Sequence, residues 1–295
     1  MRYSIHHRTV YRYEDNVSYS HHLARLTPLE TPVQNHISSR IVVTPAPDIL
    51  TSHRDYFNNP TSFFSLASPH QELVIDSHSE VVIAHSPANT LDLSPAWEIV
   101  RDQVRRSTIS ADLAAAEFCF ASPLCPVLPD LVAYTLESFR PGTPILQATT
   151  DLTRRIHEDF SFDNSATTVT TPVSEVFAKR AGVCQDFAHL QISCLRSLGL
   201  PARYVSGYIR TDPPPGKPRL IGADASHAWI SLYVPQLGWT DFDATNNIIP
   251  TTNHIWVAHG RDYHDICPIR GTVYGGGTQT LAIGVTVTPL ESASS

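Results

Sequence analysis

Residues 180–190 read Arg-Ala-Gly-Val-Cys-Gln-Asp-Phe-Ala-His-Leu, and this stretch decides the fold. Its glycine predicts a turn, and the apolar residues that follow recur at steps of three and four, as on one face of a helix. We expect that helix to run from about Cys184 to Leu198, because Gly199 and Pro201 then stop it. Cys184 therefore lies at a helix start, where backbone N–H groups and the helix dipole stabilise a thiolate.

A lone cysteine in a helix is more often a buried structural residue than a nucleophile. That interpretation suits Cys194, which falls on the apolar face of the predicted helix. It suits Cys184 less well, because Cys184 precedes that face. The remaining cysteines have no histidine or acid in a recognisable arrangement: Cys119, Cys125 and Cys267. Cys184 is therefore the candidate nucleophile.

A histidine that could serve Cys184 as a base lies in the predicted strand that begins at Ser226. The two-residue period of a strand puts its apolar side chains on one face: Ala228, Ile230, Leu232 and Val234. His227 lies on the other, mixed face, where a site can be built. A histidine on such a face is more often merely solvated, so its value depends on its neighbours.

Two acids follow in a short predicted strand, and either could orient His227. Asp241 and Asp243 alternate onto one face of residues 239–243. A turn near Leu237 and Gly238 would make an antiparallel hairpin that brings an acid beside His227. The local pattern does not choose between the two acids, and two solvated carboxylates are the simpler alternative. Cys, His and Asp in this order are the parts of a thiol nucleophile with its base and orienter.

The rest of the chain predicts an α+β protein of two parts. Residues 1–90 are rich in short strand-like runs between prolines, which indicates a β-rich N-terminal domain. Residues 91–295 combine helical segments with the core that carries Cys184, followed by C-terminal β strands. Gly275, Gly276 and Gly277 are interpreted as a turn between the last two strands.

Composition restricts the partners that we expect. The chain has 295 residues, 42% hydrophobic and 17% charged, which is typical of a globular protein. A net charge of −7 argues against nucleic acid and against an anionic membrane surface as partners. No apolar window is long enough to span a bilayer. No secretory signal is recognisable, and five widely spaced cysteines fit a reduced compartment, so we expect a cytoplasmic location.

Cofactors and metals are not expected. No Cys-x-x-Cys or His-Glu-x-x-His spacing occurs among the 5 cysteines and 15 histidines. No glycine-rich phosphate loop follows a predicted strand. Oligomeric state has no signature in the sequence.

Four blocks together resemble the bacterial transglutaminase-like family, whose members share the papain-like fold of thiol enzymes. The blocks are residues 182–190, 199–208, 224–229 and 242–246. The first 85 residues resemble, more weakly, the β-rich N-terminal region that often precedes this core. Two departures stand out: Ala244 occupies a position where the family commonly has proline, and Phe162 one where relatives often have tyrosine.

The resemblance implies Cys184 as nucleophile, His227 as base and then acid, and Asp243 rather than Asp241 as orienter. The fold that it implies is a papain-like transglutaminase core, in which the cysteine helix packs on an antiparallel sheet. The Cys184 backbone N–H is a candidate donor to the oxyanion. Residues that could complete the oxyanion site or shape the cleft are Gln185, Asp224 and Trp229.

The expected function is thiol-dependent acyl transfer at an amide bond of a peptide, a protein or a small amide. Hydrolysis, as in a peptidase or amidase, is the first interpretation. Transamidation is the second, because the residues do not determine whether water or an amine takes the acyl group. A non-catalytic binding module on the same fold is the alternative from another class. That alternative predicts loss of one of the three residues, and all three are present.

Overall fold

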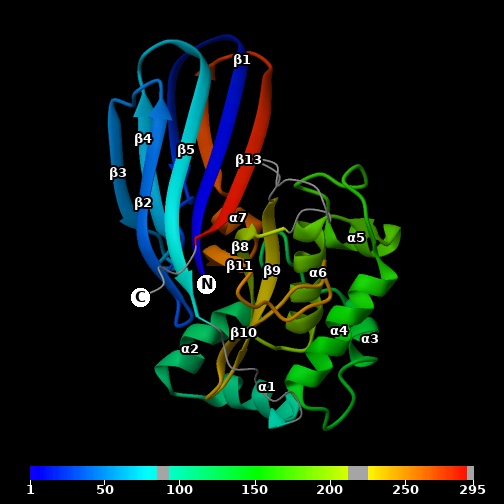
Figure 1. The fold of residues 1–295 in the computed structure, drawn as a ribbon. Helices are drawn as coiled ribbons and strands as arrows, with labels where there is room; N and C mark the ends of the chain where they lie inside the picture. Colours follow the sequence, from blue (N-terminus) through cyan, green and yellow to red (C-terminus); the bar gives the residue numbers. More distant parts are fainter. Residues whose placement is uncertain (85–92, 212–224, 291–295) are drawn as a thin grey trace, which may run out of the picture.

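The computed structural model describes residues 1–84, 93–211 and 225–290 (Figure 1). It confirms the predicted α+β class. A tall β-sheet built from both ends of the chain stands beside a unit in which helices cover a smaller antiparallel sheet. Within the described ranges, no helix is long and apolar enough to cross a membrane.

The tall sheet is organised around β1 (Arg2–Ala24), a strand of 23 residues. Over its first half, buried residues alternate with more exposed ones, as expected of a strand that has one covered face. Four further antiparallel strands come from the same part of the chain: β2 (Gln34–Thr44), β3 (Ile49–Arg54), β4 (Pro60–Leu66) and β5 (His70–Ile83). The β-rich character predicted for the N-terminal region is therefore present.

The last two strands return to this N-terminal sheet, as the red strand beside the blue one in Figure 1 illustrates. β12 (Ile269–Gly275) and β13 (Gln279–Leu290) each pair antiparallel with a different half of β1. The sequence analysis assigned the C-terminal strands to the second domain, residues 91–295. The structure corrects this, because both strands belong to the N-terminal sheet. Local pattern predicts that a segment forms a strand, but the partner strand here lies at the opposite end of the chain.

The three glycines between β12 and β13 do not form a hairpin turn, because both strands run antiparallel to β1 and hence in the same direction. Gly275, Gly276 and Gly277 have backbone φ angles of 90°, 87° and 60°, which residues other than glycine rarely adopt. The N–H of Gly276 donates to the carbonyl of Asn16, and its carbonyl accepts from Asp15. The glycines thus carry the chain from one half of β1 to the other.

The middle of the chain is mainly helical. The helices are α1 (Trp97–Arg106), α2 (Ser110–Ala116), the 3-10 helix η2 (Glu117–Cys119), α3 (Pro129–Leu136), α4 (Ile145–Asp159), α5 (Val173–Lys179) and α6 (Cys184–Ser197). The predicted cysteine helix is α6, and it ends as expected before Gly199, whose φ is 74°. α6 is buried on every side from Asp186 to Arg196, because α3, α4 and α5 cover the face that the sequence left to solvent.

The smaller sheet has the order β10-β9-β8-β11 and is antiparallel throughout. Its strands are β8 (Ala202–Ile209), β9 (Ala225–Val234), β10 (Gly238–Phe242) and β11 (His254–Gly260), and the short α7 (Tyr263–Ile266) follows. α6 packs against β9, and the apolar residues Ala228, Ile230 and Leu232 share a core with it. The predicted hairpin is formed by β9 and β10, with Gly238 opposite Val234.

The two units meet through an apolar layer between the sheets. Ile255 and Val257 of β11 and Tyr208 of β8 are buried against side chains of the tall sheet: Tyr3, Ile5, Val81, Ile83, Val285 and Val287. Each sheet therefore covers part of one face of the other. As a result, β11, at the edge of the smaller sheet, is supported by strands from both termini of the chain.

Candidate active site

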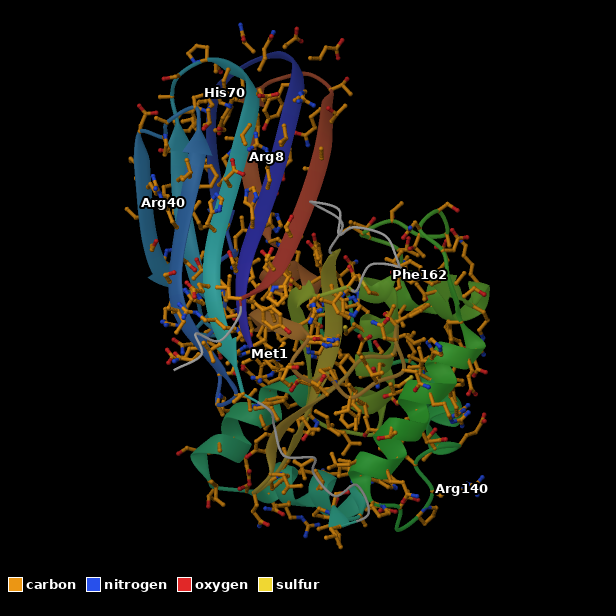
Figure 2. All side chains as sticks on the ribbon, viewed as in Figure 1. Met1, Arg8, Arg40, His70, Arg140 and Phe162 are labelled. Carbon is orange, nitrogen blue, oxygen red and sulfur yellow. The ribbon has the colours of Figure 1, made fainter. Side chains whose placement is uncertain are left out.

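Cys184 is the first residue of α6, and a short parallel pair of strands brings the chain to that position. These strands are β6 (Ser161–Phe162) and β7 (Ala181–Gly182). A Cβ on Gly182 would lie 2.7 Å from Oδ2 of Asp186, so only glycine permits this close approach. Cys184 is partly exposed, and the side chain of Phe162, which pairs with Gly182, lies at the surface (Figure 2).

Asp186 caps the helix that begins at Cys184. Its Oδ2 accepts the Val183 backbone N–H at 2.8 Å and the Thr167 hydroxyl at 2.6 Å. Burial raises the pKa of Asp186, and these two hydrogen bonds act against that rise. The Thr167 contact also ties residues 163–172 to the start of the helix, so Asp186 acts on Cys184 through the backbone.

His227 of β9 lies between Cys184 and Asp243. Its Nε2 is 2.8 Å from Oδ2 of Asp243, and the Cys184 side chain lies close enough to influence its pKa. Since Nε2 faces the carboxylate, Nδ1 is the ring nitrogen left for the sulfur. Burial lowers the pKa of His227, but the contacts with Asp243 and Cys184 outweigh it and raise the pKa from 6.5 to about 9. These contacts favour the protonated form of His227.

Asp243 follows β10 directly, and its side chain is fully buried. Oδ1 accepts the backbone N–H groups of Thr245 and Asn246, at 3.0 and 3.3 Å. Oδ2 accepts from His227 and from the Asn246 amide, the latter at 2.7 Å. Burial raises the pKa of Asp243, but these donors outweigh it and hold the pKa well below its usual range. The carboxylate is therefore ionised beside His227.

Asp241, the other candidate acid, belongs to a different network. Its Oδ2 accepts the indole N–H of Trp229 at 3.0 Å and that of Trp256 at 2.7 Å. Burial raises the pKa of Asp241. The structure therefore brings His227 together with Asp243 and not with Asp241, which is the choice that the family resemblance implied.

The other predicted site residues have partners of their own. The Trp229 N–H is committed to Asp241, and the ring is buried, so this residue packs beneath the site rather than donating to an oxyanion. The Gln185 side chain donates to the carbonyl of Val169 at 3.0 Å, which directs it to the neighbouring loop. Asp224 lies outside the described residues.

The remaining cysteines have environments unlike that of Cys184. Burial raises the pKa of Cys119 to about 11 and the pKa values of Cys125 and Cys194 to about 12. Cys194 is fully buried in the core, as predicted. The Cys267 thiol donates to the carbonyl of Ile269 at 3.2 Å.

Two residues beside Asp243 escaped the sequence analysis, namely Asn246 and His254. The Asn246 amide contacts both Asp243 and Nε2 of His227, the latter at 3.3 Å. His254 opens β11, and its Nε2 lies 3.0 Å from Oδ2 of Asp243. The short apolar run Ile-Trp-Val-Ala at residues 255–258 is the signal that could have revealed this strand.

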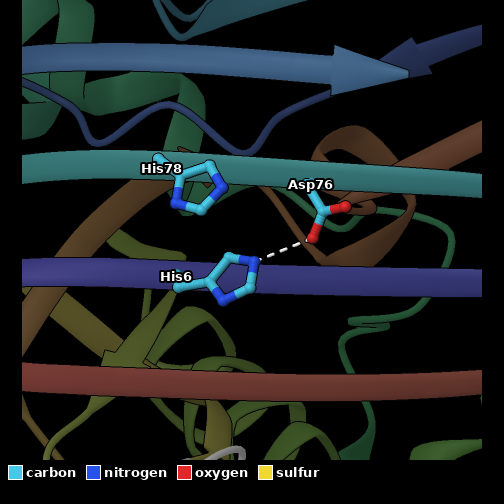
Figure 3. A group of neighbouring side chains, drawn as sticks. All are labelled: His6, Asp76 and His78. Carbon is cyan, nitrogen blue, oxygen red and sulfur yellow. Dashed lines mark hydrogen bonds and ion pairs between the residues drawn. The ribbon is translucent and has the colours of Figure 1, made fainter. Parts of the chain in front are cut away.

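Two groups among the described residues have the donor types and proximity of metal ligands. One is His227, Asp243 and His254, whose facing nitrogens are hydrogen-bonded to the carboxylate. The other, shown in Figure 3, joins His6 of β1 to Asp76 and His78 of β5 on the tall sheet. Nε2 of His6 lies 2.7 Å from Asp76, whose carboxylate also pairs with Arg8 at 3.0 Å. A cation already neutralises that carboxylate, which disfavours a metal there.

Comparisons with known proteins agree with this architecture. Residues 3–82 match the bacterial transglutaminase-like N-terminal region, and residues 133–244 match the transglutaminase-like superfamily. An uncharacterized protein of Mycobacterium tuberculosis is 40% identical over 299 residues, which cover 98% of this chain and 93% of the relative. An uncharacterized protein of Mycobacterium leprae is 32% identical over 289 residues, covering 96% of this chain and 97% of that protein.

Two further matches carry a description of function. A protein-glutamine gamma-glutamyltransferase of Pseudomonas aeruginosa is 34% identical over 76 residues, covering 25% of this chain and 11% of that protein. The crystal structure of a candidate cysteine protease from Cytophaga hutchinsonii has a TM-score of 0.78 at 21% identity, covering 100% of this chain and 92% of that one. The second match shows that the fold is shared along the whole chain.

Proposed function

This chain belongs to the transglutaminase-like superfamily, and from that premise we propose that it is a thiol-dependent acyl-transfer enzyme acting on amide bonds. In this proposal Cys184 is the nucleophile, His227 the base and then the acid, and Asp243 the residue that orients His227. The observation that carries the proposal is the position of His227, whose Nε2 lies 2.8 Å from a buried carboxylate and whose pKa is raised by both Asp243 and Cys184.

The chemistry follows from that arrangement. A cationic His227 beside the sulfur favours a thiolate–imidazolium pair. The thiolate attacks the carbonyl carbon of the amide, and the Cys184 backbone N–H at the helix start is a donor to the oxyanion. His227 then gives its proton to the leaving nitrogen, the C–N bond breaks, and a thioester on Cys184 results. A second acceptor takes the acyl group and restores the thiol.

Hydrolysis is the outcome that we propose first. Water reaches a partly exposed Cys184 without needing a binding site of its own, whereas transfer to an amine requires a site that holds the amine in place. The substrate would then be a peptide, a protein or a small amide, and the enzyme a peptidase or amidase.

Transamidation is the second candidate. The specific observation that favours it is the match of 76 residues to a protein-glutamine gamma-glutamyltransferase. In that case the thioester passes its acyl group to a primary amine. The two candidates share the first half-reaction and differ only in the acceptor, so one experiment distinguishes them.

The test uses the whole protein with a diverse library of peptides and small amides, with and without an added primary amine. Mass spectrometry of the products distinguishes a free acid, which indicates hydrolysis, from an amine adduct, which indicates transfer. The control is Cys184→Ala, which removes the sulfur from a partly exposed position. If Cys184→Ala turned over the same substrate at the wild-type rate, the proposal would be wrong.

A further inference from the structure

We propose that His254 is a positioning residue of this site, which holds the Asp243 carboxylate turned toward His227. The inference rests on the proposed function and concerns how its orienting acid is itself held. His254 does not touch Cys184 in any described contact. It acts through Asp243, whose Oδ2 it shares with His227 at 3.0 and 2.8 Å.

The hydrogen atoms of this arrangement are determined by the carboxylate. An ionised carboxylate only accepts hydrogen bonds, so Nε2 of His227 and Nε2 of His254 both carry a hydrogen directed at Oδ2. The two rings approach the same oxygen from different strands, with their centroids 5.8 Å apart. The carboxylate is therefore fixed between an imidazole of β9 and an imidazole of β11.

The environment of Nδ1, the other ring nitrogen of His254, indicates why this position is occupied by a histidine. Nδ1 is buried and has no hydrogen-bond partner among the described residues. Burying an unpaired polar atom destabilises a protein, and an apolar side chain would fill the same space without that cost. The bond that Nε2 makes to Asp243 is what an apolar residue would lose.

The ring of His254 is held rigidly enough to serve as an anchor. It meets the ring of Trp229 edge-on, at 5.1 Å and 86°, and Trp229 is itself held by Asp241. The strand that carries it is supported from outside, because Ile255 and Val257 pack against the tall sheet. The N-terminal region thereby supports the site through β11.

Two effects of His254 on His227 have opposite signs, and a pH profile separates them. The titratable groups that face His254 are Asp243 and His227, with Asp241 beyond Trp229. A donor on Oδ2 withdraws charge from the carboxylate and so weakens its hold on the His227 proton. An anchor on Oδ2 keeps the carboxylate aimed at His227 and so strengthens that hold. The anchoring effect is the larger one, so His254 raises the pKa of His227 on balance.

The experiment compares His254→Leu with His254→Gln in the full chain, because the glutamine amide can place an N–H where Nε2 lies. For His254→Leu we expect kcat to fall on the order of tenfold to a hundredfold with little change in KM. We also expect the high-pH limb of kcat/KM to move down by about one pH unit. His254→Gln should restore most of both quantities.

The matched control is His259→Leu, a histidine of the same strand whose Nδ1 is also buried without a partner among the described residues. It should leave the pH limb where it is. Thermal unfolding checks that each variant folds; if His254→Leu does not, His254→Asn, whose amide falls short of Oδ2, is compared with His254→Gln. If the high-pH limb of kcat/KM stays in place or moves to higher pH in the variant that lacks the donor, the inference is overturned. Full activity of Cys184→Ala would instead overturn the proposed function, so the two failures are distinguishable.

Discussion

At the residue scale, hydrogen bonds within the site outweigh the effect of burial on the charges of Asp243 and His227. Asp243 is ionised although it is buried, because five hydrogen-bond contacts, from Thr245, Asn246, His227 and His254, converge on its two oxygens. That charge in turn raises the pKa of His227 to about 9, against the effect of the histidine's own burial. In the proposed mechanism, this is the proton that His227 gives to the leaving amine.

Replacing Asp243 with asparagine should reverse this balance. Burial of His227 would persist, while the charge that raises its pKa would be lost, so we expect the pKa to fall from about 9 toward or below 6.5. Because the protonated form is the one paired with the thiolate, activity in the wild type should be lost as the pH rises through about 9. In Asp243→Asn the loss should occur at a lower pH, with kcat reduced about a hundredfold.

A pH series of kcat/KM on both proteins checks this prediction. Asp241→Asn is the control, because Asp241 accepts from Trp229 and Trp256 and has no described contact with His227. An alkaline limb that coincides in Asp243→Asn and in the wild type would contradict the account.

The sequence allowed Cys184, His227 and Asp243 to be proposed as site residues, because each lies in a local pattern that places its side chain. Asn246 and His254 could not be found in the same way. Asn246 depends on a loop that folds back on Asp243, which is paired with Ile248 as an isolated bridge. His254 depends on β11 pairing with β8, a register that local periodicity does not specify.

At the element scale, the start of α6 determines where the sulfur lies. Asp186 satisfies the backbone N–H of Val183, and Gly182 leaves room for it. The sequence predicted this helix and its end, but it predicted one apolar face. The structure buries the helix on every side from Asp186 to Arg196, and the Arg196 guanidinium donates to the carbonyls of Phe118, Ala202 and Arg261. Periodicity cannot anticipate burial of an arginine that backbone carbonyls satisfy.

Removing the cap should loosen the start of α6. For Asp186→Ala we expect the free energy of unfolding to fall by about 1 kcal/mol, the usual effect of losing a helix cap, together with the loss of the bond from Thr167. Activity should fall as well, because Cys184 belongs to the first turn. Denaturant unfolding and kcat/KM are the measurements.

Glu175→Ala provides the matched comparison. Glu175 is also an acid in the first turn of a helix, α5, but it is exposed and pairs only with the exposed Lys179 among the ion pairs of the described residues. We expect that exposed pair to change stability by about 0.5 kcal/mol or less. Equal effects of the two substitutions would mean that Asp186 has no special role at the helix start.

At the scale of the whole molecule, the two ends of the chain build one sheet that supports the other. Strand-like runs predicted the β-rich N-terminal region, yet nothing local indicated that residues 269–290 return to it. Val285 and Val287 of β13 lie in the layer that packs on β11. A division of the chain at residue 90 would therefore separate strands of one sheet from each other.

A charge in that layer should separate the sheets. We expect Val287→Asp to reduce the free energy of unfolding by about 3 kcal/mol or more, because an unpaired carboxylate would be buried between them. Ile283→Asp, on the same strand but 56% exposed, should have little effect. Thermal unfolding of the two variants tests the point, and a Val287→Asp protein as stable as Ile283→Asp would contradict it.

The central claim is that His227 activates Cys184, and the pH dependence of Cys184 alkylation tests it most directly, without knowledge of the substrate. The rate of iodoacetamide modification of each cysteine is followed by peptide mass spectrometry from pH 5 to 10, in the wild type and in His227→Ala. We predict that Cys184 reacts fastest of the five cysteines in the wild type, and that its rate at neutral pH falls in His227→Ala. Equal rates for all five cysteines, or a Cys184 profile unchanged by the loss of His227, would contradict the account.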